Sequence, residues 1–252
     1  MSTSTTSFSI QREPELLGQT VVVIGGSAGI GLETARRARA EGASVILTGR
    51  NPEALQRAAK EVEVLSSAAF DATDSASLEH FFRDLPVIDH VMVTAGGPRY
   101  GRLLDMDFEQ ARRALDAHPM LMLEVARNAA HKVRPGGTLV FMGGTGGKRP
   151  GIGLGIVPTV TAALPALTAS LALELAPVRV NLIAAGFVDT PLSASLLGDE
   201  LENRRSQLRA TLPIRRVVGP ADVAALAIHI MSNTALTGAT YDIDGGQQLI
   251  AR

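Results

Sequence analysis

The hydrophobic positions of this chain fall into two repeating patterns. Short runs rich in β-branched residues alternate with longer segments in which apolar residues are spaced three or four positions apart. The runs are typical of strands buried in a parallel sheet, and the wider spacing is typical of amphipathic helices. We therefore predict an α/β fold, a Rossmann-type doubly wound parallel sheet of about seven strands with helices on both faces. The predicted strands are residues 21–24, 44–48, 64–70, 88–94, 138–142, 178–183 and 239–243.

Several of the predicted helices carry start and stop signals. One begins near Gly29 and ends at Glu41, where Gly42 supplies a left-handed cap. Asn51 and Pro52 are typical of the N-cap and the first position of a helix over residues 52–62. Another predicted helix is capped by Asp74 or Ser75 and runs through Phe82. The remaining predicted helices cover residues 106–132, 156–175 and 221–231.

The domain organisation follows from where this alternation holds. Residues 1–18 are polar and show no period, so we predict a flexible N-terminal arm. Strands and helices alternate over residues 19–252, which predicts a single dinucleotide-binding domain. Within it, residues 191–213 are rich in charge and fit no clear pattern, and we interpret them as a small substrate lid.

Composition excludes several classes of function. A formal net charge of -1 leaves no basic stripe, so nucleic acid is not an expected partner. The absence of cysteine removes disulfides, thiolate nucleophiles and sulfur-ligated metals, and no metal site is predicted. No apolar run approaches about 18 residues and the N-terminus lacks a signal sequence, so we expect a soluble cytoplasmic protein that does not bind membranes.

The first strand leads into a glycine-rich turn, residues 25–31. Glycine lets the chain turn sharply and brings backbone amides close to a bound group. The helix that follows has unpaired amides and a positive dipole end, which favour an anion such as a pyrophosphate. The alternative is a tight turn that binds nothing.

The end of the second strand indicates which dinucleotide is bound. In a Rossmann site the adenosine ribose lies there, about 20 residues past the glycines, and an acidic residue binds the 2′-hydroxyl of NAD. This chain instead has Gly49, Arg50 and Asn51. The Arg50 guanidinium can bind a 2′-phosphate with two hydrogen bonds, so the sequence favours NADP(H) over NAD(H). A solvated loop arginine is the alternative.

Several motifs together resemble those of the classical short-chain dehydrogenase/reductase family. The family's Gly-x-x-x-Gly-x-Gly falls on Gly25, Gly29 and Gly31, and its Asn-Asn-Ala-Gly falls on residues 93–96. Residues 171–181, 185–190 and 244–246 are also typical, and the resemblance runs from Gly18 to the C-terminus.

The resemblance implies a cofactor site and an assembly. Asp71, which ends a strand, is placed to accept a hydrogen bond from the adenine amino group, Val188 to hold the nicotinamide carboxamide through its backbone, and Thr190 to lie against the carboxamide or the pyrophosphate. The family assembles as dimers or tetramers, so a homodimer or homotetramer is expected. The predicted cofactor-binding residues are Gly25, Ser27, Gly29, Ile30, Gly31, Arg50, Asp71, Ala72, Ala95, Gly96, Gly186, Val188 and Thr190.

The catalytic residues that the resemblance implies are absent. The family's tyrosine and lysine fall on Val157 and Thr161, its serine falls on Gly144 with Thr145 adjacent, and its asparagine falls on His118. The chain's tyrosines, Tyr100 and Tyr241, are elsewhere. The chain is therefore similar to a divergent branch that keeps the cofactor half and lacks the Tyr-x-x-x-Lys pair.

Other side chains then become candidates for the chemistry. His118 ranks first because an imidazole titrates near neutral pH and Pro119 is expected to kink the helix beside it, although a packing histidine is equally consistent. Thr145 could hydrogen-bond a substrate oxygen, or cap its own backbone. Weaker candidates are an anion-binding pair at Lys148 and Arg149, and Tyr100 as a donor from a mobile loop.

The leading hypothesis is an NADP(H)-dependent oxidoreductase acting on a small carbonyl or alcohol substrate through a non-standard active site. The main rival is a catalytically inactive NADP(H)-binding protein, a sensor or partner subunit, and it draws support from Val157 and Thr161. A third possibility is a fold reused for elimination or isomerisation, which would turn over substrate without changing the redox state of the cofactor.

Overall fold

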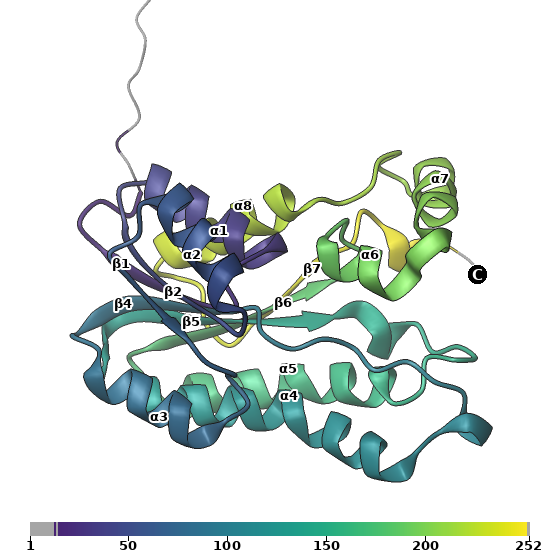
Figure 1. The fold of residues 1–252 in the computed structure, drawn as a ribbon, viewed down its shortest axis with the longest axis horizontal. Coiled ribbons are helices and arrows are strands. Elements are labelled where there is room, and N and C mark those ends of the chain that lie inside the picture. The colour runs from purple at the N-terminus through teal and green to yellow at the C-terminus, as the bar shows by residue number, and fades with distance from the viewer. Residues whose placement is uncertain (1–12, 14, 251–252) are drawn as a thin grey trace, which may run out of the picture.

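A single parallel sheet of seven strands organises the chain, in the order β3-β2-β1-β4-β5-β6-β7 (Figure 1). The computed structural model describes residues 13 and 15–250. The order reverses between β1 and β4, and ligands of open α/β sheets bind at such a switch point, outside the carboxyl ends of the strands. The strands are β1 (Thr20–Ile24), β2 (Ser44–Gly49), β3 (Ser66–Ala69), β4 (Ile88–Val93), β5 (Val133–Gly144), β6 (Arg179–Ala185) and β7 (Thr240–Ile243).

Helices cover both faces of the sheet, as the sequence predicts. One face carries α1 (Gly29–Ala40), α2 (Pro52–Val62) and α8 (Pro220–Ser232) (Figure 1). The other carries α3 (Ser75–Asp84), α4 (Phe108–Ala129) and α5 (Val157–Glu174). The segment expected to form a lid folds as two helices, α6 (Pro191–Leu197) and α7 (Leu201–Thr211), joined by a short 3-10 turn.

The pleat of the strands divides the core into two layers. In β1, Val22 and Ile24 pack among side chains of α3, α4 and α5, whereas Val21 and Val23 pack against α1, α2 and α8. Successive side chains of a strand point to opposite faces, so a strand buried on both sides is apolar throughout. This is the physical basis of the continuous apolar runs.

The predicted helix ends are confirmed where a local cap fixes them. The Asn51 side chain accepts a 2.9 Å hydrogen bond from the amide of Ala54, and Pro52 begins α2. Asp74 accepts bonds from the first amides of α3, and so it is the cap rather than Ser75. Gly42 has a φ of 84°, the left-handed conformation expected after α1.

Strand β5 is longer than predicted at both ends. The predicted strand covers residues 138–142, so Gly136 and Gly137 lie before it and Gly143 and Gly144 lie after it. Instead β5 includes Gly137, where a Cβ atom would lie 2.2 Å from the Asp89 carbonyl oxygen. Gly143 and Gly144 pair with β6, and residues 145–148 form a 3-10 turn. These glycines allow close packing, which sequence alone does not distinguish from a turn.

The predicted arm is shorter than expected at its described end. Residues 15–18 form a turn, Leu16 is fully buried, and its amide donates a 3.0 Å hydrogen bond to the Glu41 carbonyl. Tertiary packing therefore recruits an apolar residue from a segment that has no period. The earlier part of the arm lies outside the described residues, apart from Glu13.

Two helices on one face differ from expectation. Helix α4 continues through Pro119 without a break, from Phe108 to Ala129. Helix α5 is an 18-residue apolar segment with a mean hydropathy of 1.3, which corrects the prediction that no apolar run reaches that length. By length and composition alone it could cross a membrane, but core helices of soluble proteins pass the same test, and α5 packs on α4 and β6.

Acid should destabilise the fold through His90. This side chain of β4 is 2% exposed, its Nε2 lies 2.5 Å from Gln19 Oε1, and burial lowers its pKa to about 4. Because the folded pKa lies below that of the unfolded chain, protons favour unfolding as the pH falls from about 6.5 toward 4. We expect the protonation of His90 to lower the free energy of unfolding by about 3 kcal/mol over that pH window. Urea unfolding at pH 7 and pH 4.5 measures the loss.

The matched variant for this experiment is His90→Gln, which keeps a polar side chain and removes the titration. Carboxylates also take up protons in this range, so the difference between the two proteins isolates the histidine. Equal losses of unfolding free energy in both would contradict the assignment.

Candidate active site

The turn between β1 and α1 is closed so tightly that it excludes side chains at two glycines. A Cβ at Gly25, whose φ is 93°, would lie 2.7 Å from the amide nitrogen of Ala95, and one at Gly31 would lie 2.3 Å from the Gly25 carbonyl oxygen. The Thr94 hydroxyl donates to the carbonyls of Ile24 and Gly25. The end of β4 therefore holds the first turn in place.

This turn leaves the start of α1 available to an anion. The N-cap residue is Ala28, and its side chain makes no capping hydrogen bond. The first amides of the helix are then free of a side-chain cap, and the helix dipole places partial positive charge there. Gly29, at the start of the helix, lies close to Thr190, where its Cβ would be 3.5 Å from the threonine Cβ.

The adenosine end of the predicted site gathers residues from the ends of β2 and β3. Ser27 packs against Gly49, at which a Cβ would lie 3.0 Å from the serine Oγ. Hydrogen bonds from the Thr73 amide and hydroxyl hold the pKa of Asp71 below its usual value, and the nearby charge of Arg50 adds to the effect. Arg50 and Asp71 therefore lie close enough to interact. The neighbouring Ala72 is buried in the core.

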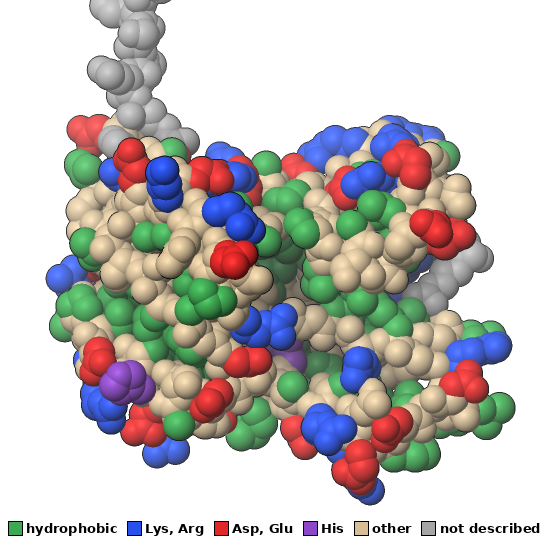
Figure 2. Space-filling model, in the orientation of Figure 1, with side chains coloured by type: hydrophobic (Ala, Val, Ile, Leu, Met, Phe, Trp, Pro, Cys, Tyr) green, Lys and Arg blue, Asp and Glu red, His purple; other side chains and the backbone are tan. Residues whose placement is uncertain are grey.

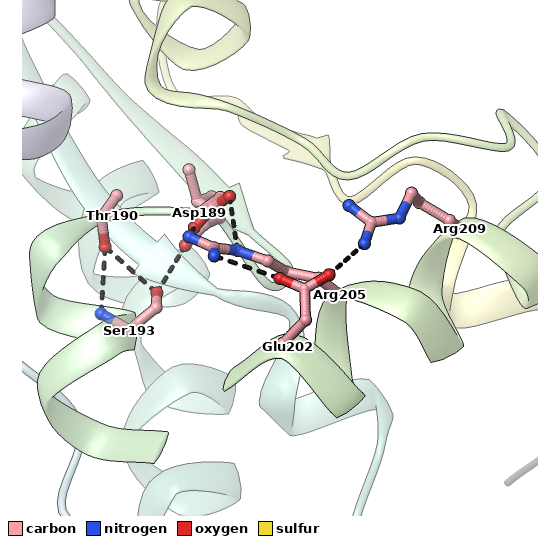
Figure 3. Close-up of polar contacts among 7 residues, drawn as sticks. Asp189, Thr190, Ser193, Glu202, Arg205 and Arg209 are labelled. Carbon is pink, nitrogen blue, oxygen red and sulfur yellow. Dashed lines mark hydrogen bonds and ion pairs between the residues drawn. The ribbon is translucent and has the colours of Figure 1, made fainter. Parts of the chain in front are cut away.

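The opposite end of the site is the segment after β6, residues 186–190, which is held at several points. A Cβ at Gly186 would lie 2.5 Å from Gln247 Oε1, and that same oxygen accepts a bond from the Phe187 amide. Val188 is buried and forms a parallel bridge with Val218. In Figure 3, Thr190 and Ser193 face each other at the start of α6, where Thr190 is the N-cap.

An ion pair ties the lid to this segment. Arg205 of α7 donates from Nε and Nη2 to the two carboxylate oxygens of Asp189, at 2.9 and 2.7 Å (Figure 3). Glu202 accepts from both Arg205 and Arg209, so three charges of α7 form one network with Asp189. The pairing with Asp189 raises the pKa of Arg205. Nothing in the sequence pattern of residues 191–213 indicated this pair.

The residues aligned with the missing catalytic group do meet in space. A Cβ at Gly146 would lie 3.1 Å from Val157 Cγ1 and 3.2 Å from Thr161 Oγ1, and one at Gly144 would lie 3.3 Å from Thr161 Cγ2. The Thr161 hydroxyl donates to the Val157 carbonyl at 2.8 Å. Thr145 is buried in the adjoining 3-10 turn. Apolar groups and a satisfied hydroxyl therefore occupy this region.

His118 is held between α4 and β5. Its Nε2 donates a 2.7 Å hydrogen bond to the Met142 carbonyl, and burial lowers its pKa while that bond opposes the shift. A neutral imidazole carries one N–H, so Nδ1 remains an acceptor. Nδ1 faces Gly96, where a Cβ would lie 3.5 Å away. In the neutral form Nδ1 is therefore the acceptor, and the role of His118 as proton donor stays a prediction.

The remaining candidate residues, Lys148 and Tyr100, lie in different parts of the structure. Lys148 pairs with Asp242 of β7, and its role with Arg149 as an anion-binding pair stays a prediction. Tyr100 lies in the segment after β4, where burial raises the pKa of its phenol and the charge of Arg204 opposes that rise. The Arg204 guanidinium carbon lies 5.9 Å from the centre of the Phe187 ring. Sequence reasoning named neither Arg204 nor Phe187 as a site residue, because lid and motif residues meet only in the folded chain.

The surface above the carboxyl ends of the strands is hollowed between the α1–α2 side and the lid (Figure 2). The turn after β1, the ends of β2 and β3, and residues 186–190 all lie at this edge of the sheet. Fold and turns together are those of a nucleotide-binding, doubly wound α/β protein.

Comparison with known proteins places the chain in a family. The family model described as enoyl-(acyl carrier protein) reductase matches residues 25–248. The short-chain dehydrogenase/reductase ATR9 of Stachybotrys chlorohalonatus is 28% identical, over 92% of this chain and 98% of that protein. The chain belongs to the short-chain dehydrogenase/reductase family.

Solved structures agree with this assignment. A small-chain dehydrogenase in complex with NADPH matches with a TM-score of 0.79 and 27% identity, over 92% of this chain and 99% of that one. The MalC reductase/Diels-Alderase of Malbranchea aurantiaca matches with a TM-score of 0.87 and 25% identity, over 94% and 99%. BdcA in complex with NADPH matches with a TM-score of 0.82 and 26% identity, over 92% and 95%.

Proposed function

We propose that this protein is an NADP(H)-dependent oxidoreductase that transfers a hydride between the nicotinamide and a small carbonyl or alcohol substrate. The turn between β1 and α1 supports this proposal most directly. Gly25 and Gly31 leave no room for side chains, and the helix that follows has no side-chain cap. A cradle of backbone amides at a sheet switch point fits the pyrophosphate of a dinucleotide.

The residues around this cradle fit the rest of the cofactor. Arg50 follows β2 where a carboxylate would select NAD, so its charge would hold the 2′-phosphate of NADP(H). Asp71 would accept from the adenine amino group, and Val188 and Thr190 would hold the carboxamide end. The cofactor, when bound, supplies the hydride.

The substrate would lie between residues 143–157 and the lid. Thr145 is a candidate to hydrogen-bond the substrate oxygen, and His118 is a candidate to accept a hydrogen bond through Nδ1. Neither replaces the acid that Val157 and Thr161 lack. The active site is therefore proposed to be atypical for the family.

Removing the Arg50 guanidinium should discriminate between the two dinucleotides. In Arg50→Ala we expect NADPH affinity to fall roughly ten- to hundredfold, the worth of a charged hydrogen-bond pair, and NADH affinity to change less than about twofold. Calorimetric or fluorescence titration measures both. The control is Arg57→Ala, which removes the same charge from the exposed face of α2. Equal losses of affinity for NADPH and NADH would contradict a contact between Arg50 and the 2′-phosphate.

Turnover tests the enzymatic proposal. Purified protein is mixed with NADPH and a panel of ketones, quinones and imines, and both NADPH absorbance and substrate mass are followed. We expect at least one substrate to be reduced with matching loss of NADPH. A protein that binds NADPH and converts nothing is the inactive binding protein that Val157 and Thr161 also allow.

A redox-neutral reaction is the second candidate. The similar protein MalC is named a reductase/Diels-Alderase, and that name covers a redox and a non-redox activity. In the same turnover panel, a redox-neutral reaction would change the mass or the isomer of the substrate while the NADPH absorbance stays constant.

The cytoplasmic location of the protein stays a prediction.

We also propose that the protein is a homodimer or homotetramer. Only 22% of the apolar helix α5 is buried, and Leu173 is 83% exposed. On the adjoining α4, Met120 and Leu123 are also exposed. Exposed apolar side chains on two adjoining helices are typical of an interface.

Light scattering tests the assembly. We expect the mass of a dimer or tetramer, and a shift toward the monomer for Leu173→Glu, because the variant buries a charge in the interface. Leu65→Glu is the control, since Leu65 is exposed to a similar degree on the strand-β3 side of the sheet. A monomeric wild-type protein would overturn the proposal.

A further inference from the structure

The segment after β6, residues 186–190, turns one side of its backbone toward the lid. On the other side, the Asp189 amide donates a 2.9 Å hydrogen bond to the carbonyl of Val218, the residue that forms a bridge with Val188. Neighbouring peptide groups of an extended chain face opposite sides, so the amide and the carbonyl of Val188 point away from Val218. That carbonyl accepts a 2.5 Å hydrogen bond from the Ser193 hydroxyl of α6. The backbone proposed to hold the nicotinamide therefore lies on the side of the lid.

Thr190 joins this segment to α6 and to the start of α1. Its hydroxyl accepts a 3.2 Å hydrogen bond from the Ser193 amide and so caps α6 (Figure 3). Its side chain also borders the start of α1, where a Cβ at Gly29 would lie 3.5 Å from the Thr190 Cβ. Val188 and Thr190 are the two residues of the segment proposed to contact the nicotinamide end, and Asp189 lies between them.

The Asp189 side chain is bonded to the lid helix α7. Arg205 donates from Nε and Nη2 to the two carboxylate oxygens, at 2.9 and 2.7 Å (Figure 3). Two parallel charged hydrogen bonds fix the orientation of both groups and are stronger than neutral ones. The two side chains are only 30% and 32% exposed, so salt and water screen the pair less than they screen a fully exposed one. The pair therefore links α7 to the residue that lies between Val188 and Thr190.

The first part of the lid is held by polar contacts rather than by a hydrophobic core. Residues 191–207 include α6 and most of α7, and no side chain in this range is buried. Leu208 and Leu212 are buried, and they anchor the far end of the lid. A segment with few buried apolar contacts opens at a low cost in free energy, so its position depends on its polar contacts. Ser193 and Arg205 make such contacts with residues 188–190.

We propose that the Asp189–Arg205 ion pair couples the lid to the nicotinamide end of the cofactor site, with Arg205 as a positioning residue. The inference rests on the proposed NADP(H)-dependent function. When the nicotinamide is bound, the Val188 backbone and the Asp189 carboxylate are fixed together, and the paired position of α7 is favoured. The coupling is reciprocal, so a paired α7 raises the affinity for the nicotinamide half of the cofactor. The adenosine half, at the ends of β2 and β3, takes no part in the coupling.

Two ligands distinguish the halves of the site. NADPH spans both, whereas 2′,5′-ADP carries the adenosine and the 2′-phosphate without the nicotinamide. In Arg205→Gln we expect the affinity for NADPH to fall roughly three- to tenfold, the worth of a half-buried ion pair, and the affinity for 2′,5′-ADP to stay within about 1.5-fold. Calorimetric titration measures both affinities.

The matched control is Arg36→Gln. It removes a guanidinium that is also paired with two carboxylates, Glu33 and Glu61, on the α1–α2 surface. We expect the affinities of this variant for NADPH and for 2′,5′-ADP to stay within about 1.5-fold of the wild-type values, because the pair does not contact residues 186–190.

A double-mutant cycle assigns the loss of affinity to the pair itself. We expect Asp189→Asn to lower the NADPH affinity about as much as Arg205→Gln does, and the double variant to lose no more than either, because removing one partner already breaks the pair. Arg205→Lys should keep part of the affinity, since an ammonium retains the charge but cannot make the two parallel bonds. Losses that add up in the double variant would contradict the coupling.

Hydrogen exchange tests the coupling in the direction from cofactor to lid. In the wild-type protein we expect NADPH to slow amide exchange in residues 201–207 at least about threefold, and 2′,5′-ADP to leave it unchanged. In Arg205→Gln saturated with NADPH, the slowing in residues 201–207 should disappear, while slowing in residues 25–31 should remain. Equal slowing of exchange in α7 of the wild-type protein and the variant would overturn the proposal.

The outcomes separate this proposal from the one on which it rests. If Arg205→Gln lowers the affinities for NADPH and for 2′,5′-ADP by the same factor, α7 is not coupled to the nicotinamide end, and the proposed cofactor site stands. If the wild-type protein binds neither ligand, the NADP(H)-dependent function fails, and the coupling fails with it.

Discussion

The close approach of the β1–α1 turn to the end of β4 is the constraint on which the site depends. With Gly31 packed on the Gly25 carbonyl and Gly25 packed on the Ala95 amide, the backbone itself forms the wall of the crevice. Thr94 fixes the contact by bonding the carbonyls of Ile24 and Gly25. The contact sits where the strand order reverses, so the helix α1 start opens into the crevice instead of being covered.

The second half of the site depends on how positive charge is distributed over the lid. Arg205 is paired with Asp189 and Glu202, and that pairing anchors α7 to the segment after β6. Arg204, its neighbour, instead lies over the Phe187 ring, with its guanidinium carbon 5.9 Å from the ring centre. Two adjacent arginines on one helix thus make different contacts, one with Asp189 and the other with the Phe187 ring. The distinction comes from which residues the folded loops bring opposite them.

Much of the fold could be predicted because its causes are local. Asn51 and Asp74 cap the helices that directly follow them, and β-branched runs form the buried strands regardless of what lies elsewhere. Predictions failed where a distant partner decides the outcome. Gly137 reads as a turn residue but is needed because Asp89 lies against it, and Leu16 reads as part of an arm but is buried beside Glu41. The sequence pattern within one segment carries no information about which distant residues will contact it.

By itself, the sequence predicted the sheet and its connections, because the β-branched runs and the glycines of the first turn act within or directly beside their own strands. Only the tertiary structure decided which partners the candidate side chains contact. It bonded His118 to Met142, paired Lys148 with Asp242, and brought Arg204 of α7 over the Phe187 ring. The proton chemistry of a side chain depends on burial and on neighbouring charges, and the folded chain sets both.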